Sequence, residues 1–210
     1  MKLYNLTLFF LLNLCIVVLA ILTQEFLDIE RLLIDTLYEQ FSSDQVNRIL
    51  SFNRKWEWVS YLLLPLILLL KISLIAKILD AGIFFIDREI SYGKLFSLVL
   101  RAEFIFLGIP VAKFLWFYCI QTDFDLIDLQ TFYPLSILNF FDVDNIEQWF
   151  IYSFQILNLF EIVYWLVLAY GIKKMLKIPY YQAFNSVMLS YGICLFIWIV
   201  AVMFFYLNMS

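Results

Sequence analysis

Histidine is absent from this 210-residue chain, and glycine, proline and cysteine are scarce, with 5, 4 and 3 residues. Without histidine the chain lacks the usual general base near neutral pH and the commonest metal ligand in proteins. It also has no Gly-x-Ser-x-Gly element, no phosphate-binding glycine loop and no histidine-based motif. These absences argue against an enzyme, and we expect no catalytic residue, no cofactor and no metal site.

The cysteines lie in apolar stretches and show no spacing typical of metal ligands. We therefore expect them to be buried thiols rather than a disulfide or a metal site. They are Cys15, Cys119 and Cys194.

Charge is also scarce, since only 15% of the residues are charged while 64% are hydrophobic. A soluble domain of this size carries more charge, so the excess apolar surface is expected to face lipid. No basic run suggests nucleic acid as a partner.

Five apolar stretches are each long enough, at about 1.5 Å per residue, to cross a hydrocarbon core of about 30 Å. The sequence therefore predicts an all-α fold, a single polytopic membrane bundle over residues 1–210 with five transmembrane helices. The first stretch is preceded by Lys2 like a secretory signal, but its apolar run is longer than a usual signal core. The five predicted spans are Leu3–Thr23, Trp58–Leu79, Leu95–Ile120, Trp149–Ile172 and Ala183–Leu207.

Basic residues indicate the orientation, because cytoplasmic loops of membrane proteins carry an excess of Lys and Arg. Counted over the short loops, they place the N-terminus in the cytoplasm and Ser210 outside. The outer loop 121–148 carries only acidic charges, which we interpret as a solvated segment or, alternatively, a divalent cation site. The basic residues on the predicted cytoplasmic side are Lys2, Lys77, Arg88, Lys94, Lys173, Lys174 and Lys177.

The outer loop 24–57 contains apolar residues spaced three or four apart, with charged residues on the opposite face. This pattern predicts an amphipathic helix that lies along the outer leaflet or caps the bundle. The alternative is a docking surface for a partner protein. The apolar residues are Phe26, Ile29, Leu33, Leu37 and Phe41.

Two segments of the chain are similar to each other. Ile90, Tyr92, Phe96 and Val99 recur at a constant offset in a second block, each block opening a predicted span after a short basic turn. The sequence therefore predicts two helical hairpins of the same orientation, over residues 58–120 and 149–207. The second block contains Ile178, Tyr180, Phe184 and Val187.

The second hairpin resembles the closing half of the Yip domain family. Leu157-Asn-Leu-Phe160 and Trp165 precede Gly171 and a basic turn, after which Lys177-Ile-Pro-Tyr-Tyr-Gln-Ala183 opens the last span. Pro179 and Gln182 replace the small polar and basic residues of the family pattern. The resemblance covers residues 157–190 as a motif and 58–207 as a topology. It implies five spans, a cytoplasmic N-terminus and an outward C-terminus, and it implies no particular biochemical role.

Ionisable residues within predicted spans are costly and usually face the bundle interior with a partner. Lys71, Glu103 and Glu161 lie at similar depths, about 10–17 Å from the cytoplasmic boundary, and Arg101 lies slightly nearer to it. We predict a buried cluster in which Lys71 pairs with Glu103 or Glu161. Such a pairing can fix helix register, or it can form a proton or ion relay.

Two functions are compatible with these patterns. The first is a non-catalytic scaffold or accessory subunit of a membrane complex, with the lipid bilayer and other membrane subunits or further copies of the chain as partners. The second is a small transporter or channel component. A transporter predicts a polar cavity reaching the charged cluster, or broken helices at Pro65 or Pro110, whereas a scaffold predicts a dry aromatic core.

Overall fold

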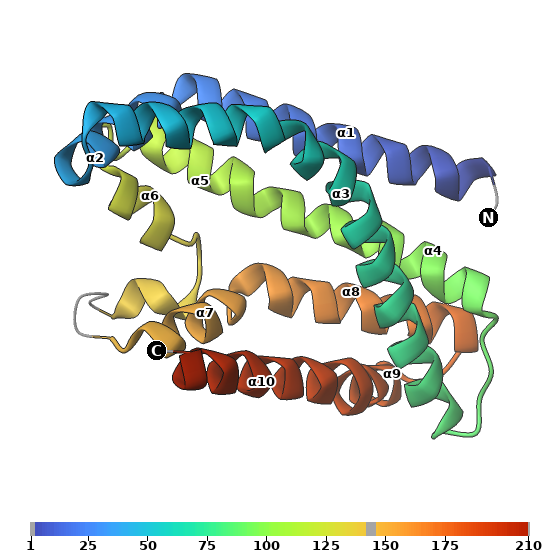
Figure 1. Cartoon of the computed structure of the whole chain (residues 1–210). Helices are drawn as coiled ribbons and strands as arrows, with labels where there is room; N and C mark the ends of the chain where they lie inside the picture. The colour runs from blue at the N-terminus through green and yellow to red at the C-terminus, as the bar shows by residue number, and fades with distance from the viewer. Residues whose placement is uncertain (1–2, 142–145, 210) are drawn as a thin grey trace.

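The computed structural model describes residues 3–141 and 146–209, and these are mostly helical (Figure 1). Within these ranges no strand forms, and only an isolated antiparallel bridge joins Ser136 to Asn158. The α-helices are α1 (Leu3–Phe26), α2 (Ile29–Gln40), α3 (Ser43–Phe84), α4 (Tyr92–Ala102), α5 (Gly108–Cys119), α6 (Leu126–Thr131), α7 (Gln148–Ile156), α8 (Leu159–Leu176), α9 (Tyr180–Val187) and α10 (Ile193–Met209). The shorter segments are two 3₁₀ turns, η1 (Glu103–Leu107) and η2 (Ile137–Phe140), and a π-helical segment, η4 (Met188–Gly192).

Four helices in the described part of the chain are long and apolar enough to cross a membrane. They are α1, α3, the continuous run Tyr92–Cys119 and the continuous run Tyr180–Met209. Their length and composition indicate a membrane-embedded protein. The predicted span Trp149–Ile172 differs from the other four, because it is divided between α7 and α8 by Leu157 and Asn158.

α3 begins at Ser43, well before the expected boundary at Trp58. Ser42 and Gln45 form a capping box at its start, in which the Ser42 N–H and hydroxyl each lie 3.1 Å from Gln45 Oε1. The stretch 24–57 is therefore not a simple loop, since it holds α2 and the first part of α3. Pro65 lies inside α3, and the helix bends over its middle portion in Figure 1.

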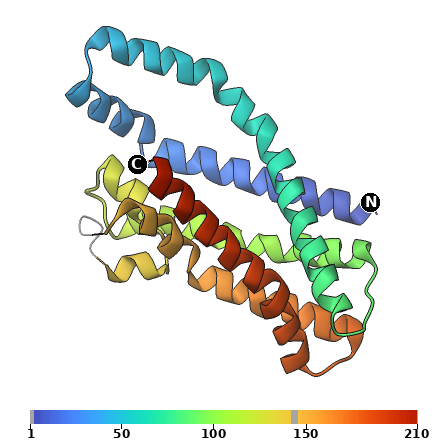
Figure 2. The ribbon, with the colours of Figure 1, turned by 60° about the horizontal axis from the view of Figure 1, so that its bottom comes forward.

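α2 and residues 43–58 of α3 form a segment beside the bundle, which we call the arm. In Figure 2 the first half of α3 stands apart from the helices that follow it. The two parts of the arm are joined by an ion pair between Arg54 and Glu30, whose charged atoms lie 2.5 Å apart. At about 1.5 Å per residue, the 42 residues of α3 measure roughly 63 Å, twice the thickness of a hydrocarbon core.

The main core lies where α4, α8 and α9 meet the second half of α3. Two glycines allow the close approach of the two hairpins here. A Cβ on Gly82 of α3 would collide with Ser190, and a Cβ on Gly171 of α8 would collide with Leu98 of α4. In each hairpin, therefore, a glycine in the first helix is the point at which a side chain of the other hairpin makes close contact.

The similar segments of the two hairpins make similar contacts. The Tyr92 hydroxyl donates to the Ser73 carbonyl at 3.4 Å, and the Tyr180 hydroxyl donates to the Leu166 carbonyl at the same distance. Each tyrosine also lies beside the phenylalanine one turn later, Tyr92 near Phe96 at 6.3 Å and Tyr180 near Phe184 at 6.2 Å between ring centroids. These matched contacts follow the internal similarity of the sequence.

Candidate functional site

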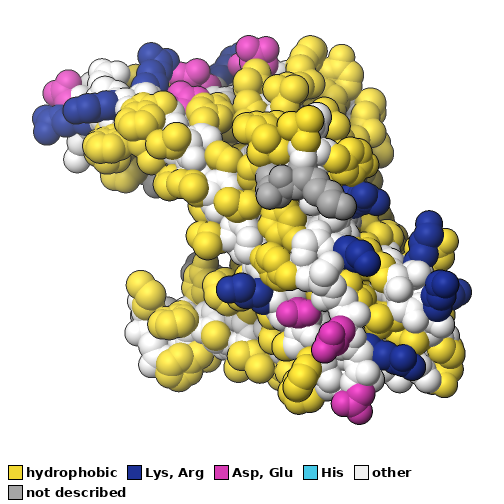
Figure 3. Space-filling model, turned by 90° about the vertical axis from the view of Figure 1, so that its right-hand side faces the viewer, with side chains coloured by type: hydrophobic (Ala, Val, Ile, Leu, Met, Phe, Trp, Pro, Cys, Tyr) yellow, Lys and Arg dark blue, Asp and Glu magenta, His cyan; other side chains and the backbone are white. Residues whose placement is uncertain are grey.

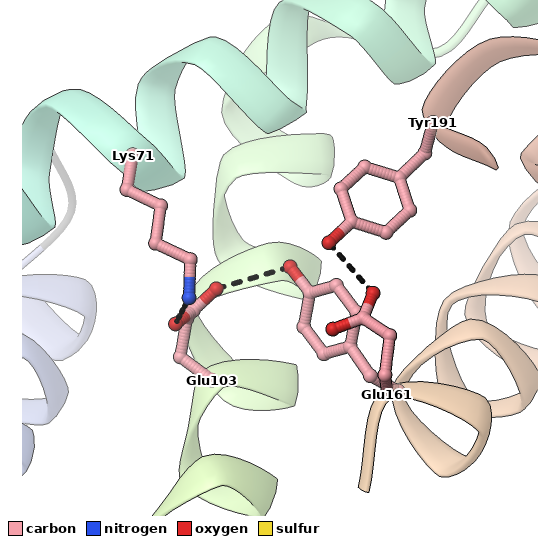
Figure 4. Close-up of polar contacts among 5 residues, drawn as sticks. Lys71, Glu103, Glu161 and Tyr191 are labelled. Atoms are coloured by element: carbon pink, nitrogen blue, oxygen red, sulfur yellow. Dashed lines mark hydrogen bonds and ion pairs between the residues drawn. The ribbon is translucent and has the colours of Figure 1, made fainter. Parts of the chain in front are cut away.

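Glu103 occupies the centre of a polar network in the core, although its side chain is only 3% exposed. Its Oε2 lies 2.7 Å from the Lys71 ammonium, and its Oε1 accepts a hydrogen bond of 3.1 Å from the Tyr164 hydroxyl (Figure 4). Glu103 is the first residue of η1, where the helix tightens into a 3₁₀ turn. Pro110 follows closely and has no N–H with which to continue the α-helical hydrogen bonds.

Glu161 forms the second acidic position of the network. One carboxylate oxygen, Oε1, accepts from the Tyr191 hydroxyl at 2.8 Å and from the Trp165 indole N–H at 2.7 Å. Glu161 lies in the first turn of α8, whose N-cap is Asn158, and the Asn158 side chain accepts from the Glu161 N–H at 2.9 Å. A carboxylate is stabilised at this helix end by the aligned peptide dipoles.

The break before α8 is closed by the segment that precedes η2. The Leu159 N–H donates to the Leu135 carbonyl, and the Ile137 N–H donates to the Leu157 carbonyl, each at 3.0 Å. These bonds satisfy the backbone groups that the interrupted helix leaves free. Irregular backbone is tolerated at membrane depth only where protein or a water-filled cavity satisfies it in this way.

Tyr191 lies in the π-helical segment η4, and its ring packs edge-on against Tyr164 at 5.6 Å between centroids. Glu103, Glu161 and Tyr191 therefore each lie at or next to an irregular point of a helix. Glu103 lies in a 3₁₀ turn, Glu161 in the first turn after a break, and Tyr191 in a π-helical segment. Such interruptions commonly mark functional or strained positions in helices.

The predicted cluster is brought together in part. Lys71 pairs with Glu103, and Glu161 joins this pair only through Tyr164 and Tyr191 (Figure 4). Arg101 lies elsewhere, with its guanidinium 5.3 Å from the centroid of the Tyr4 ring.

Lys113, nearer the opposite end of the bundle, donates to the Leu129 carbonyl.

Four members of the network were not predicted from the sequence: Tyr164, Trp165, Tyr191 and Asn158. The Asn158-x-x-Glu161 spacing is a signal of a helix N-terminus that indicates the break in the apolar stretch. Tyr191 lies at the position that corresponds to Glu103 in the second similar segment, so the repeat itself could have indicated it.

The apolar face predicted in residues 26–41 is partly occupied inside the molecule. Phe26 packs edge-on against Phe114 and Tyr118 of α5, and Ile29 packs against a small core of Leu27, Phe117 and Leu129. Leu33 and Leu37 are half-buried, while Phe41 remains 41% exposed. This face therefore packs in part against α5 and α6, and only the remainder is available to an external partner.

The acidic residues of the predicted outer loop have different structural roles, and Glu147, for example, is the N-cap of α7. Asp125 and Asp128 form a capping box at the start of α6, in which the Asp128 N–H donates to Asp125 Oδ1 at 2.7 Å. Asp142 and Asp144 lie outside the described residues. Among the described residues, no group of three or more His, Cys, Asp or Glu side chains could hold a metal ion.

In the same loop, burial raises the pKa of the Tyr133 hydroxyl, and the negative charge of Glu161 raises it further.

Chemically, the network provides two buried, hydrogen-bonded carboxylates with hydroxyl and indole donors, and one ammonium group, that of Lys71, whose side chain is 43% exposed. It can fix the relative positions of α3, α4–α5, α8 and η4, because each of them contributes a partner. Comparisons with known proteins return no match, whether against family models, curated proteins or solved structures.

Proposed function

We propose that this chain is a non-catalytic integral membrane protein that serves as a scaffold or accessory subunit of a membrane complex. The observation that carries the proposal is the arm, whose aromatic side chains have no partner large enough to cover them. Phe52 is 63% exposed, Trp56 48% and Trp58, at the end of the arm, 60%. Arg48, Lys55 and other charged residues share this segment, so it is poorly suited to the hydrocarbon core.

A mixed aromatic and charged surface beside the bundle is the composition expected of a protein–protein interface, where Trp, Tyr, Phe and Arg are enriched. The polar network supports the same function. Both carboxylates are almost fully buried and satisfied by internal donors, and neither lines the large cavity at the basic end of the bundle. The interior is thus suited to holding helices in place.

The topology that we propose has five spans, with α7 and α8 together as the fourth, as in the Yip-like architecture. The N-terminus lies on the cytoplasmic side of a bacterial inner membrane and the C-terminus outside. The concentration of Lys and Arg in the two short turns before α4 and α9 supports this orientation.

The proposal is tested by isolating the tagged chain from gently solubilised membranes and identifying proteins that co-purify in stoichiometric amounts. We expect one or a few membrane proteins, or further copies of the chain, to be retained. Replacing Phe52, Trp56 and Trp58 together by Ala should release them, since buried aromatic residues dominate the energy of such interfaces.

The matched control replaces exposed aromatic residues outside the arm, Phe84, Phe85 and Phe140, by Ala. This variant should retain the same partners. A chain that purifies alone and monodisperse, or two triple variants that lose partners equally, would contradict the accessory-subunit proposal.

A small transporter or channel component is the second candidate, and the convergence of three helix interruptions on Glu103, Glu161 and Tyr191 favours it. Proton flux into vesicles containing the purified chain tests this function. A flux that Glu103→Gln abolishes would support a relay, whereas equal leakage from protein-containing and protein-free vesicles would support the scaffold.

A further inference from the structure

A cavity of about 990 Å³ opens between α1, α3, α4 and α8, at the end of the bundle where the chain turns from α3 into α4 and from α8 into α9. This volume is at the upper end of the range typical of ligand sites. Neither carboxylate of the polar network lines it, so it is a separate feature of the molecule.

The charges that line the cavity all have the same sign. Lys94 and Arg101 of α4 and Lys174 of α8 line it, and no Asp or Glu does. Among the described residues none of these three side chains forms an ion pair. In Figure 3, which views the right-hand side of Figure 1, Lys and Arg side chains gather over this end of the molecule. A group of like charges lining one cavity attracts anions from solution.

Neutral polar groups add hydrogen-bond donors to the same cavity. Asn5 is only 6% exposed, and its Oδ1 accepts from the Ser97 hydroxyl at 2.9 Å, while its Nδ2 donates to no described residue. At the first turn of α4, a Cβ added to Gly93 would meet no atom within 4 Å, so the backbone is accessible from the cavity. Free N–H groups at a helix N-terminus favour an anionic oxygen.

Apolar side chains form the remainder of the lining, including Leu69, Leu98 and Val167. Lys94 and Arg101 are seven positions apart on α4, which places Arg101 about 10 Å deeper along the helix axis. Val167 lies equally far from Lys174 on α8, so the deeper part of the cavity combines the Arg101 cation with apolar side chains, while Lys94 and Lys174 lie nearer the basic turns. A free phosphate ion matches only the charged part of such a site.

We propose that this cavity binds one anionic phospholipid, with the phosphate held by Lys94, Arg101 and Lys174 and the upper acyl chain lying against the apolar wall. Basic pockets between transmembrane helices are a known mode of headgroup recognition. Arg101 is preset for this role because its guanidinium rests on the Tyr4 ring at 5.3 Å rather than on a carboxylate. The site requires only that the helices span a membrane, and it does not depend on the scaffold function.

The test uses the full chain, delipidated in detergent, with added phosphatidylglycerol, phosphatidylcholine or inorganic phosphate. Native mass spectrometry counts bound lipid, and the apparent melting temperature measures stabilisation. We expect one tightly bound phosphatidylglycerol, weak binding of phosphatidylcholine and no stabilisation by phosphate at the same concentration. Replacing Lys94, Arg101 and Lys174 together by Gln should weaken phosphatidylglycerol binding about tenfold or more.

The matched control replaces Lys77, Arg88 and Lys173 by Gln, which removes the same charge from the same end of the bundle. Lys77 and Arg88 line a separate hollow together with Asp80 and Glu89, and Lys173 faces the Tyr180 ring at 6.0 Å. This variant should bind phosphatidylglycerol like the original chain.

A second variant, Gly93→Leu, places a bulky side chain at the N-terminus of α4, inside the cavity, without removing a charge, and it should also weaken lipid binding. It keeps the test informative if the triple variant fails to fold. Equal loss of binding in the two triple variants would overturn the proposal in favour of general surface attraction. Equal stabilisation by phosphate and phosphatidylglycerol would indicate a free-anion site instead, and unchanged lipid binding by Gly93→Leu would exclude the cavity.

Discussion

Glu103 and Tyr191 occupy corresponding positions in the two hairpins, at the same offset that relates Tyr92 to Tyr180. Both reach α8, where Glu103 accepts a hydrogen bond from Tyr164 and Tyr191 donates one to Glu161. One copy of the repeat thus supplies an acceptor and the other a donor, and α8 supplies the complementary group to each. This relationship connects the two hairpins through a single helix.

Tyr191→Phe removes the hydroxyl that donates to Glu161 and leaves the ring in place. We expect it to lower the free energy of unfolding by about 1–3 kcal/mol, because a buried carboxylate loses one of its donors. Thermal unfolding in detergent measures the change. Tyr206→Phe is the control, since Tyr206 is 50% exposed, and it should have little effect. Equal effects of the two substitutions would show that the Tyr191–Glu161 bond contributes nothing.

Lys71→Met should destabilise the chain by about 1–3 kcal/mol, because the nearly buried Glu103 carboxylate loses a charged donor that reaches it from a partly exposed side chain. The double variant Lys71→Met with Glu103→Gln should recover much of this loss, since no unpaired charge remains. A double-mutant cycle of melting temperatures measures the coupling. Additive effects of the two substitutions would mean that the pair is not an energetic unit.

The sequence predicted the helical membrane bundle because apolar length is a strong signal in a chain of this composition. It also predicted that Lys71 and Glu103 lie at similar heights in the bundle, since helix rise converts position into distance, and these two side chains form an ion pair. Hydropathy did not indicate the break at Leu157 and Asn158, because it is continuous there. The local signal was the Asn158 cap, and the break also depends on backbone hydrogen bonds with the distant residues Leu135 and Ile137. The start of α3 at Ser43 was readable from the Ser42-x-x-Gln45 capping box, but the prediction placed the boundary where the apolar run begins, at Trp58.

The same limits apply to side-chain partners. Arg101 was grouped with the cluster on depth alone, but rotation around α4 directs it toward Tyr4 and the cavity. Tyr164 was not identified because an aromatic residue in an apolar span gives no sequence signal of a hydrogen-bonding role.

Gly82→Ala should destabilise the chain, by about 1–3 kcal/mol, because the added methyl group would collide with the Cβ of Ser190 and with the hydroxyl beside it. Gly93→Ala introduces the same methyl group into open space and should be neutral or stabilising, by up to about 1 kcal/mol. Both are compared by thermal unfolding in the same detergent. If the two variants melt together, the close contact of the hairpins at Gly82 is not required.

Asn158→Ala should lower the free energy of unfolding by about 0.5–2 kcal/mol, since it removes the side chain that caps α8. Asn158→Asp retains an acceptor for the Glu161 N–H but places a second negative charge beside Glu161, so we expect it to be no better than Ala. Asn208→Ala provides the control, because Asn208 bonds only to a carbonyl of its own helix. A stable Asn158→Ala variant would mean that the Leu135 and Ile137 backbone bonds suffice to hold the break.

The number of times the chain crosses the membrane decides whether its two basic turns lie on the same side. The structure allows a direct prediction of this arrangement. Lys94 and Lys174 line one cavity, so the turns before α4 and after α8 are at one end of the molecule. The Trp198 indole donates to the Tyr152 hydroxyl at 2.9 Å, so α7 lies beside α10 on the way to the opposite end. If α7 and α8 cross the membrane together, as proposed, the turns before α4 and after α8 lie on the same side of it.

In a variant whose Cys15, Cys119 and Cys194 are replaced by Ser, single cysteines at Glu89, Phe140, Lys177 and Asn208 should separate into two pairs. We expect a membrane-impermeant maleimide, applied to intact cells, to label the Phe140 and Asn208 positions and to leave the Glu89 and Lys177 positions unlabelled until the cells are opened. If α7 and α8 do not cross, Lys177 would be labelled together with Phe140, and Asn208 would be protected. That result would also separate Lys174 from Lys94 across the membrane, which is incompatible with their shared cavity.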